Sequence, residues 1–351
     1  MKTLNIRLLP ENVVTQSIIL LVIICVISEV IARTPIVKSM NLYESYGGSH
    51  PQFDTQVVRI KSRYTKEGHI DCILLGNSQI LSGIDPAVLQ QIYQKKTGRN
   101  ITCQTFGLGG LVPSTAASLA KLLIQKYHPS IIIFGTSMFD YTFYNSADAS
   151  IMSSPWVKYQ LGTFSIDGWL IENSNAYRYY LGINHYLLYY GANGETRLDS
   201  NGHLPFYGRV EKTKEQLLNE TSGILKTLDI TETQVNGLYN IVSLNSDDVK
   251  IIVLEMPVNP EIFGFSRYAR KIYPDFRNIL INETTLAGAE LLLTKDKVEI
   301  PENDWHDLTH LNQTGTLYFS HIVGNYMTNV VLSKCERKTI TFSLCEDNSN
   351  E

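Results

Sequence analysis

The fold is decided by residues 69–79, which read His69-Ile70-Asp71-Cys72-Ile73-Leu74-Leu75-Gly76-Asn77-Ser78-Gln79. A short, mostly apolar run that ends at a glycine is typical of a strand buried on both faces of a parallel sheet. Ser78 follows at a predicted strand-to-helix turn, where free backbone N–H groups can face an incoming oxyanion. Ser78 is therefore a candidate nucleophile, although a serine at such a turn also commonly caps the next helix.

The same pattern recurs along the chain. Further strand-like runs cover residues 101–106, 131–134 and 249–256, and each is followed by glycine or proline. Apolar residues at helical spacing lie between them, with Asp85-Pro86 and Ser114 as expected helix starts and His128-Pro129 as an expected stop. A last helix is predicted over 314–332. This alternation predicts an α/β three-layer sandwich with a parallel sheet, whose sites form outside the carboxyl ends of the strands.

The predicted domain organisation has four parts. Residues 1–34 form a cytoplasmic stub and signal anchor, 35–68 a linker, 69–334 the α/β domain and 335–351 a tail. The α/β pattern breaks at about residues 141–229, which we interpret as an insertion over the sheet. Many of the 20 tyrosines lie there. Half-buried tyrosines in an irregular subdomain are favoured over a tyrosine-lined carbohydrate cleft.

The N-terminus carries an apolar run from Val13 to Ala32, in which Glu29 is the only charged residue. The run approaches the ~20 residues that span a bilayer. Lys2 and Arg7 precede it, which favours a cytoplasmic N-terminus. An uncleaved signal anchor is favoured over a cleaved signal peptide because no clear small-x-small site follows, and a buried helix is the third alternative. Either of the first two places the rest of the chain outside the cytoplasm.

Composition narrows the function classes. The chain has 351 residues and a net charge of −4, and no basic block indicates nucleic acid as a partner. Five cysteines are present; Cys72 and Cys103 fit buried strands, whereas Cys335 and Cys345 could pair in an oxidising compartment. The cysteine and histidine spacing predicts no metal site, and no cofactor is expected.

A histidine and a carboxylate occur together near the C-terminal helix, in Asp307-Leu308-Thr309-His310-Leu311-Asn312. A serine hydroxyl attacks well only when a base takes its proton and a third group orients that base. His310 is the candidate base and Asp307 its orienting partner. Asp304 and His306 form a second acid–histidine pair nearby, and the segment could also be a surface loop in which Asn312 caps the last helix.

Candidate oxyanion donors follow two other predicted strands. Gly109 and Gly110 lack a side chain, so a backbone N–H there can approach an oxyanion closely. Ser137 could donate through its hydroxyl, although a local turn hydroxyl is the favoured interpretation.

Together these segments resemble the SGNH (GDSL-like) hydrolase superfamily. Leu75–Gln79 looks like its nucleophile block, Phe106–Gly110 its glycine block and Asp307–Asn312 its Asp-x-x-His block. The third block departs from the family, because Gly135-Thr136-Ser137-Met138 stands where Gly-x-Asn-Asp is usual. If Ser137 takes the place of that asparagine, one oxyanion donor is a shorter hydroxyl.

With its single N-terminal membrane segment, the chain is similar to two groups of that superfamily: envelope polysaccharide O-acyltransferases and esterases, and the D-alanine transfer protein of teichoic-acid modification. The resemblance implies an anchored, extracytoplasmic acyl-serine enzyme with an acyl donor and a glycan acceptor as partners. A membrane acyl-transfer protein is a candidate further partner. The alternative is an inactive SGNH-like protein that binds glycan or scaffolds an envelope polysaccharide system.

Overall fold

The computed structural model describes residues 13–40, 42–142, 146–185, 198–210, 215–216, 229–295, 297–336 and 344. The chain forms two compact units. Unit 1 comprises Met1–Gly47 and Ser154–Gly194, and unit 2 comprises Gly48–Ser153 and Glu195–Glu351. All candidate catalytic residues belong to unit 2.

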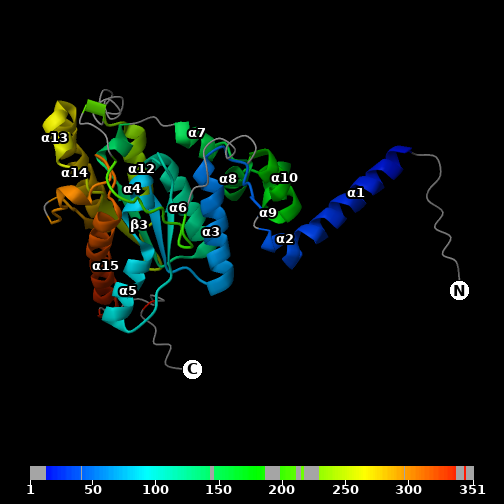
Figure 1. The fold of residues 1–351 in the computed structure, drawn as a ribbon, viewed down its shortest axis with the longest axis horizontal. Helices are drawn as coiled ribbons and strands as arrows, with labels where there is room; N and C mark the ends of the chain where they lie inside the picture. The colour runs from blue at the N-terminus through cyan, green and yellow to red at the C-terminus, as the bar shows by residue number, and fades with distance from the viewer. Residues whose placement is uncertain are drawn as a thin grey trace. The chain divides into compact units, whose positions relative to one another are not determined.

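Unit 2 is built on a parallel sheet, which confirms the predicted α/β class (Figure 1). Its strands are β1 (Cys72–Gly76), β2 (Cys103–Gly107), β3 (Ile131–Thr136), β4 (Lys250–Glu255) and β5 (Glu290–Leu292), in the order β2-β1-β3-β4-β5. Gly76 pairs with Gly107 on one side and with Gly135 on the other. β1 and β2 therefore end at one level and β3 one residue beyond it, and the segments that follow them meet at one edge of the sheet.

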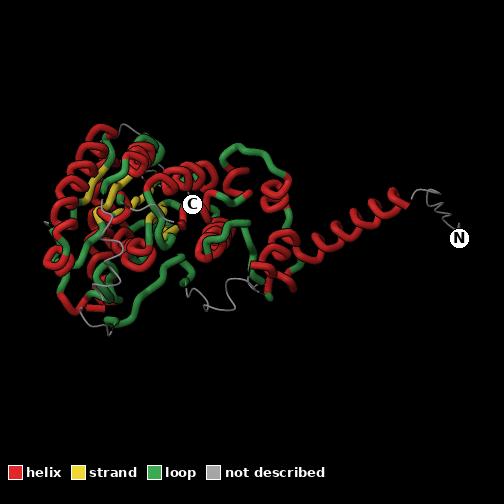
Figure 2. The backbone as a smooth tube through the Cα atoms, turned by 90° about the horizontal axis from the view of Figure 1, so that it is seen from above, coloured by secondary structure: helices red, strands yellow, loops and turns green. Residues whose placement is uncertain are grey.

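Helices cover both faces of this sheet, and Figure 2 shows the strands enclosed by them. On one face, α5 (Pro86–Thr97) and α15 (Gln313–Glu336) pack over alternate strand side chains such as Leu74 and Ile133. On the other, α6 (Pro113–Tyr127), α12 (Glu232–Val242) and α14 (Arg267–Ala287) pack together. Among the described residues, unit 2 also contains α3 (Pro51–Glu67), α4 (Ser78–Gly83), η1 (Met138–Tyr141), α7 (Ser146–Met152), α13 (Glu261–Phe265) and η3 (Glu302–Asp304).

The start of α5 agrees with the sequence prediction, and the start of α6 does not. Asp85 caps α5 as expected, with its Oδ1 accepting from Ala87 N at 2.8 Å. Ser114 does not cap α6, because Val112 occupies the N-cap position. Pro113 is the first residue of the helix, where a backbone N–H would have no partner within the helix and its absence costs no hydrogen bond. α6 ends before His128, its C-cap, which adopts a left-handed φ of 48°.

Two parts of the chain differ from the sequence prediction. The expected linker at 35–68 contains α3, a helix of 17 residues. The strand β5 is not among the strands predicted from the sequence, because it has only three residues and lies at the sheet edge. A strand this short leaves almost no periodic pattern to detect.

Unit 1 contains α1 (Val13–Ala32), α2 (Pro35–Ser39), α8 (Pro155–Gln160), α9 (Ile166–Asn173) and α10 (Asn175–His185). By length and composition α1 can cross a membrane. Helix α8 packs against α9, and the ring of Trp156 in α8 meets Tyr46 edge-on at 5.0 Å. Arg178 Nε donates to Glu44 at 2.6 Å and ties α10 to the segment after α2.

The cysteines divide as the sequence suggested, as far as the structure describes them. Cys72 and Cys103 are free and buried in neighbouring strands, and Cys25 is free in α1. Cys335 is disulfide-bonded. Its expected partner, Cys345, lies outside the described residues.

Candidate active site

Ser78 is the first residue of α4 and follows β1 through a single residue, Asn77. Asn77 caps this helix, because its Oδ1 accepts from Gln79 N at 2.8 Å. The hydroxyl of Ser78 is therefore not used for capping. The turn also requires glycine at position 76, since a Cβ there would lie 2.4 Å from the Gly135 carbonyl oxygen.

Ser78, His310 and Asp307 come together although His310 is 232 positions after Ser78. His310 Nε2 lies 2.8 Å from Ser78 Oγ, and its Nδ1 lies 2.8 Å from Asp307 Oδ2. With Nδ1 protonated and donating to the carboxylate, Nε2 is the acceptor that faces the serine hydroxyl. The arrangement has the geometry of a nucleophile, a base and a group that orients the base.

Asp307 is held in its ionised form by several donors. The backbone N–H groups of Thr309 and His310 each donate to Oδ1 at 2.7 Å, in addition to the His310 ring. Although burial alone would raise the pKa of Asp307, these hydrogen bonds and the attraction of His310 hold it well below its usual range. Asp307 therefore stays an acceptor throughout the neutral and mildly acidic range.

Gln79 holds the loop that carries Asp307 and His310, the candidate catalytic loop, beside the serine. Its Nε2 donates to the carbonyls of Thr309 at 2.8 Å and Pro257 at 3.0 Å. The side chain is 4% exposed, so these bonds are shielded from water. The residue after Ser78 is thereby joined to the residue before His310.

The Gly109 N–H points at a side chain of α3 in this structure. It donates to Gln52 Oε1 at 2.6 Å, while the Gly109 carbonyl lies 3.0 Å from His50 Nε2. An oxyanion that used this N–H would have to replace Gln52. Gly110 adopts a positive φ of 72° at the same turn, a conformation that favours glycine.

Ser137 is not brought into this group. It is fully buried, and its N–H donates to Asp140 Oδ2 at 2.8 Å, with its hydroxyl directed at the same oxygen. That position argues against the expected use of the Ser137 hydroxyl as an oxyanion donor. Asp140 also accepts from Asn77 Nδ2 at 2.6 Å, so it positions the residue before Ser78. Burial raises the pKa of Asp140 to about 6, although its hydrogen bonds act in the opposite direction and lower the pKa.

The alternative pair, Asp304 and His306, has other partners. His306 Nδ1 lies 2.8 Å from the Gly208 carbonyl, and its ring stacks on Phe206 at 4.5 Å. Phe206 also meets the His310 ring edge-on at 5.3 Å. Phe206, from the segment expected as an insertion, therefore packs against the candidate catalytic histidine. The sequence did not indicate this contact.

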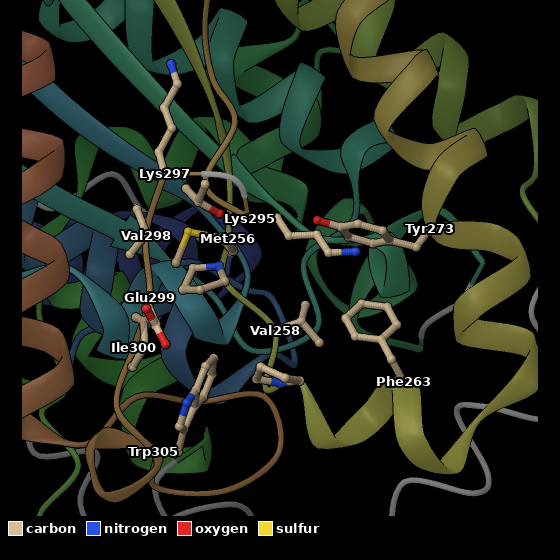
Figure 3. A pocket seen from close by; sticks show the side chains of 13 residues that line it. Met256, Val258, Phe263, Tyr273, Lys295, Lys297, Val298, Glu299, Ile300 and Trp305 are labelled. Carbon is tan, nitrogen blue, oxygen red and sulfur yellow. The ribbon is translucent and has the colours of Figure 1, made fainter.

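A cavity of about 590 Å³ opens beyond the carboxyl ends of β4 and β5. Pro257 and Trp305 form part of its wall, and the Pro257 carbonyl is the one that Gln79 binds. Lys295 Nζ lies 4.8 Å from the ring centre of Phe263 and 4.3 Å from that of Tyr273. Figure 3 shows Lys295 extending between these rings. The cavity thus combines aromatic walls with a cation.

One group of side chains among the described residues has the spacing of metal ligands. Asp85, Asp199 and His203 each place one ligand atom within 4.8 Å of the others. Asp85 is already the cap of α5, and His203 Nε2 lies 3.1 Å from the Ser82 carbonyl. No second observation points to an ion at this group.

Comparison with known proteins adds solved structures of similar fold. No family model matches the chain. No curated protein matches it either. Similar structures include an alpha/beta hydrolase enzyme from the metagenome of Lake Arreo (12% identity, 72% of this chain and 91% of that chain, TM-score 0.37). The native M. smegmatis aryl esterase is 9% identical over 74% of this chain and 99% of its own, with a TM-score of 0.36.

A third similar structure is a mutant of Axe2, an acetyl-xylooligosaccharide esterase from Geobacillus stearmophilus. It is 11% identical over 72% of this chain and 92% of its own, with a TM-score of 0.33. These likenesses are of fold. The three similar structures are those of ester-cleaving enzymes or hydrolases.

Proposed function

We propose that this protein is a serine acyl-ester enzyme, an esterase or acyltransferase, with Ser78 as nucleophile. The observation that carries the proposal is the pair of 2.8 Å contacts from His310, one to Ser78 Oγ and one to Asp307 Oδ2. Ser78 Oγ attacks the acyl carbonyl while His310 Nε2 takes the hydroxyl proton. The proton then passes to the leaving oxygen, which leaves an acyl ester on Ser78.

The second half of the reaction uses the same residues. A water or sugar hydroxyl gives its proton to His310 and attacks the acyl-serine ester, and Ser78 recovers its proton as it leaves. Asp307 stabilises the imidazolium in both halves. The oxyanion is bound by the Ser78 N–H and, once Gln52 has moved, by the Gly109 N–H.

The proposed site of action is the cell envelope. It is supported by α1, which is long and apolar enough to anchor the chain. The proposed acceptor is an envelope glycan that binds in the cavity near Pro257 and Trp305. Aromatic walls suit the apolar faces of sugar rings, and Lys295 suits an anionic substituent.

The test is covalent labelling of the full chain in detergent or nanodiscs with a fluorophosphonate, followed by intact-mass analysis. We expect one adduct on the wild type and none on Ser78→Ala, with Ser243→Ala, at an exposed position, as the control. Hydrolysis of a small aryl acetate should fall in parallel. Full labelling of Ser78→Ala would overturn the proposal.

A second candidate, a glycan-binding protein without catalysis, is favoured by one observation. The Gly109 N–H is occupied by Gln52, and Ser137 is buried, so two expected oxyanion donors are engaged inside the protein. An unlabelled wild type that still binds glycan, and whose binding is weakened by Lys295→Ala, would favour this candidate.

A further inference from the structure

Glu29, the one charge in the apolar stretch of α1, is fully paired within unit 1. Its carboxylate accepts from the Asn175 and Ala176 N–H groups, both at 3.1 Å, and from Ser174 Oγ at 2.6 Å. It therefore caps the N-terminus of α10, where the helix dipole favours a negative charge. Arg33 Nε donates to the same carboxylate at 2.6 Å. The charge is a structural joint between α1 and α10.

This joint fixes where α10 stands relative to a membrane that α1 crosses. A helix rises 1.5 Å per residue, so the 20 residues of α1 match a hydrocarbon layer of about 30 Å. Glu29 lies in the last turn of α1, at the boundary between hydrocarbon and headgroups. The start of α10, which Glu29 caps, must lie at the same depth.

Unit 1 also exposes an unusual amount of apolar surface near this joint. Outside α1, eight large apolar side chains are exposed in unit 1 and eight in the much larger described part of unit 2. On α9, Ile166 and Trp169 are three residues apart and share one helix face, as do Tyr180 and Ile183 on α10. Phe164, just before α9, is 72% exposed.

We propose that these faces of α9 and α10 lie in the headgroup layer of the bilayer that α1 enters. The inference rests on the membrane anchoring in the proposed function. Lipid is the occupant because α1 is an apolar helix that is itself unburied, and its joint with α10 sets the depth at which α10 begins. Tryptophan and tyrosine are the side chains that favour this layer, and apolar helix faces bind it in plane.

The experiment uses the full chain in nanodiscs and follows Trp169, which is 46% exposed, whereas Trp156 and Trp305 are 2% exposed. The fluorescence lost in Trp169→Phe defines the Trp169 signal. We expect lipids brominated near the headgroups to quench this signal roughly twofold more than lipids brominated at the bilayer centre, as for an interfacial tryptophan. Aqueous iodide should quench it weakly.

The other outcomes overturn the inference in distinguishable ways. Strong iodide quenching without lipid quenching would place the surface in water. Protection from both quenchers would mean that protein, such as a second copy, covers it. Failure of the full chain to float with liposomes would reject the anchor itself. Fluorophosphonate labelling of Ser78 in the same nanodiscs reports the proposed chemistry separately, and Trp169→Phe should leave it unchanged.

Discussion

The side-chain amide of Gln79 donates a hydrogen bond of 2.8 Å to the carbonyl of Thr309. Gln79 follows Ser78 in α4, and Thr309 precedes His310 in the loop before α15. One buried side chain therefore joins the two segments that must meet for Ser78 and His310 to lie 2.8 Å apart. Its second bond, to Pro257, extends this support to the cavity wall.

Replacing Gln79 by methionine should lower kcat by roughly 10-fold to 100-fold, because His310 loses its fixed position while the reacting groups remain. KM for a small ester should change little. Unfolding should become easier by about 1–3 kcal/mol, since the Thr309 and Pro257 carbonyls lose a buried partner. Steady-state kinetics and chemical denaturation measure the two effects.

The matched control is Gln91→Met, the same change at an exposed position of α5. It should leave both kcat and stability unchanged. A Gln79→Met enzyme with wild-type kcat would mean that the catalytic loop holds its position without this bond.

Replacing Asp307 by asparagine tests how His310 is oriented. The neutral asparagine amide cannot stabilise the imidazolium as the carboxylate does. Its NH2 group can also donate to His310 Nδ1, which favours the wrong tautomer of the imidazole. We expect kcat to fall by roughly 10³-fold or more. Asp307→Glu should recover part of the rate because it restores the charge. A mild loss with Asp307→Asn would show that His310 is held mainly by Gln79 and Phe206.

The sheet could be predicted from the sequence because its central strands are short apolar runs, each with a turn residue behind it. Ile131-Ile132-Ile133-Phe134 is the clearest of these, and all of its residues are buried. The edge strand β5 could not be predicted, since it has only three residues, of which two are half-buried and Leu292 is buried, too few to show a period. Helix α3 was missed because its 17 residues are mostly polar and carry only a narrow buried stripe.

Some residues of the site could likewise be predicted from the sequence, and others could not. Ser78, Asp307 and His310 could be named because each follows a recognisable local pattern, and the structure brings the three together. Gln79 was visible beside Ser78, but its role depends on the distant Thr309 carbonyl. Gln52 and Phe206 reach the site from segments with no motif. The burial of Ser137 follows from its bond to Asp140, which no spacing rule reveals.

Asp140 gives a prediction about stability and pH. Folding raises the pKa of Asp140 from 3.8 to about 6, so the folded chain binds this proton more tightly than the unfolded chain. The free energy of unfolding should therefore fall by roughly 3 kcal/mol as pH rises from about 4 to about 6, and stay lower above that range. Asp307 has the opposite sign, since its lowered pKa supplies stability that is lost only as pH falls below 3.8.

The measurement is urea denaturation at several pH values. Asp140→Asn should remove this decrease between about pH 4 and 6, because the titrating group is gone. This holds even if the substitution changes the free energy of unfolding by a constant amount at every pH. The exposed Asp275→Asn is the control and should keep the wild-type slope. An unchanged slope in Asp140→Asn would assign the decrease to other groups.

The last prediction concerns Gln52, whose Oε1 accepts the Gly109 N–H at 2.6 Å. If the oxyanion uses this N–H, Gln52 has to leave first, and breaking such a bond costs about 0.5–1.5 kcal/mol. Gln52→Ala removes that cost, so kcat/KM for a small ester should rise by roughly 2-fold to 10-fold. Gln52→Glu should lower kcat/KM, because its carboxylate keeps the N–H and repels the oxyanion. A fall with Gln52→Ala would mean that the Gln52 amide itself supports the reaction.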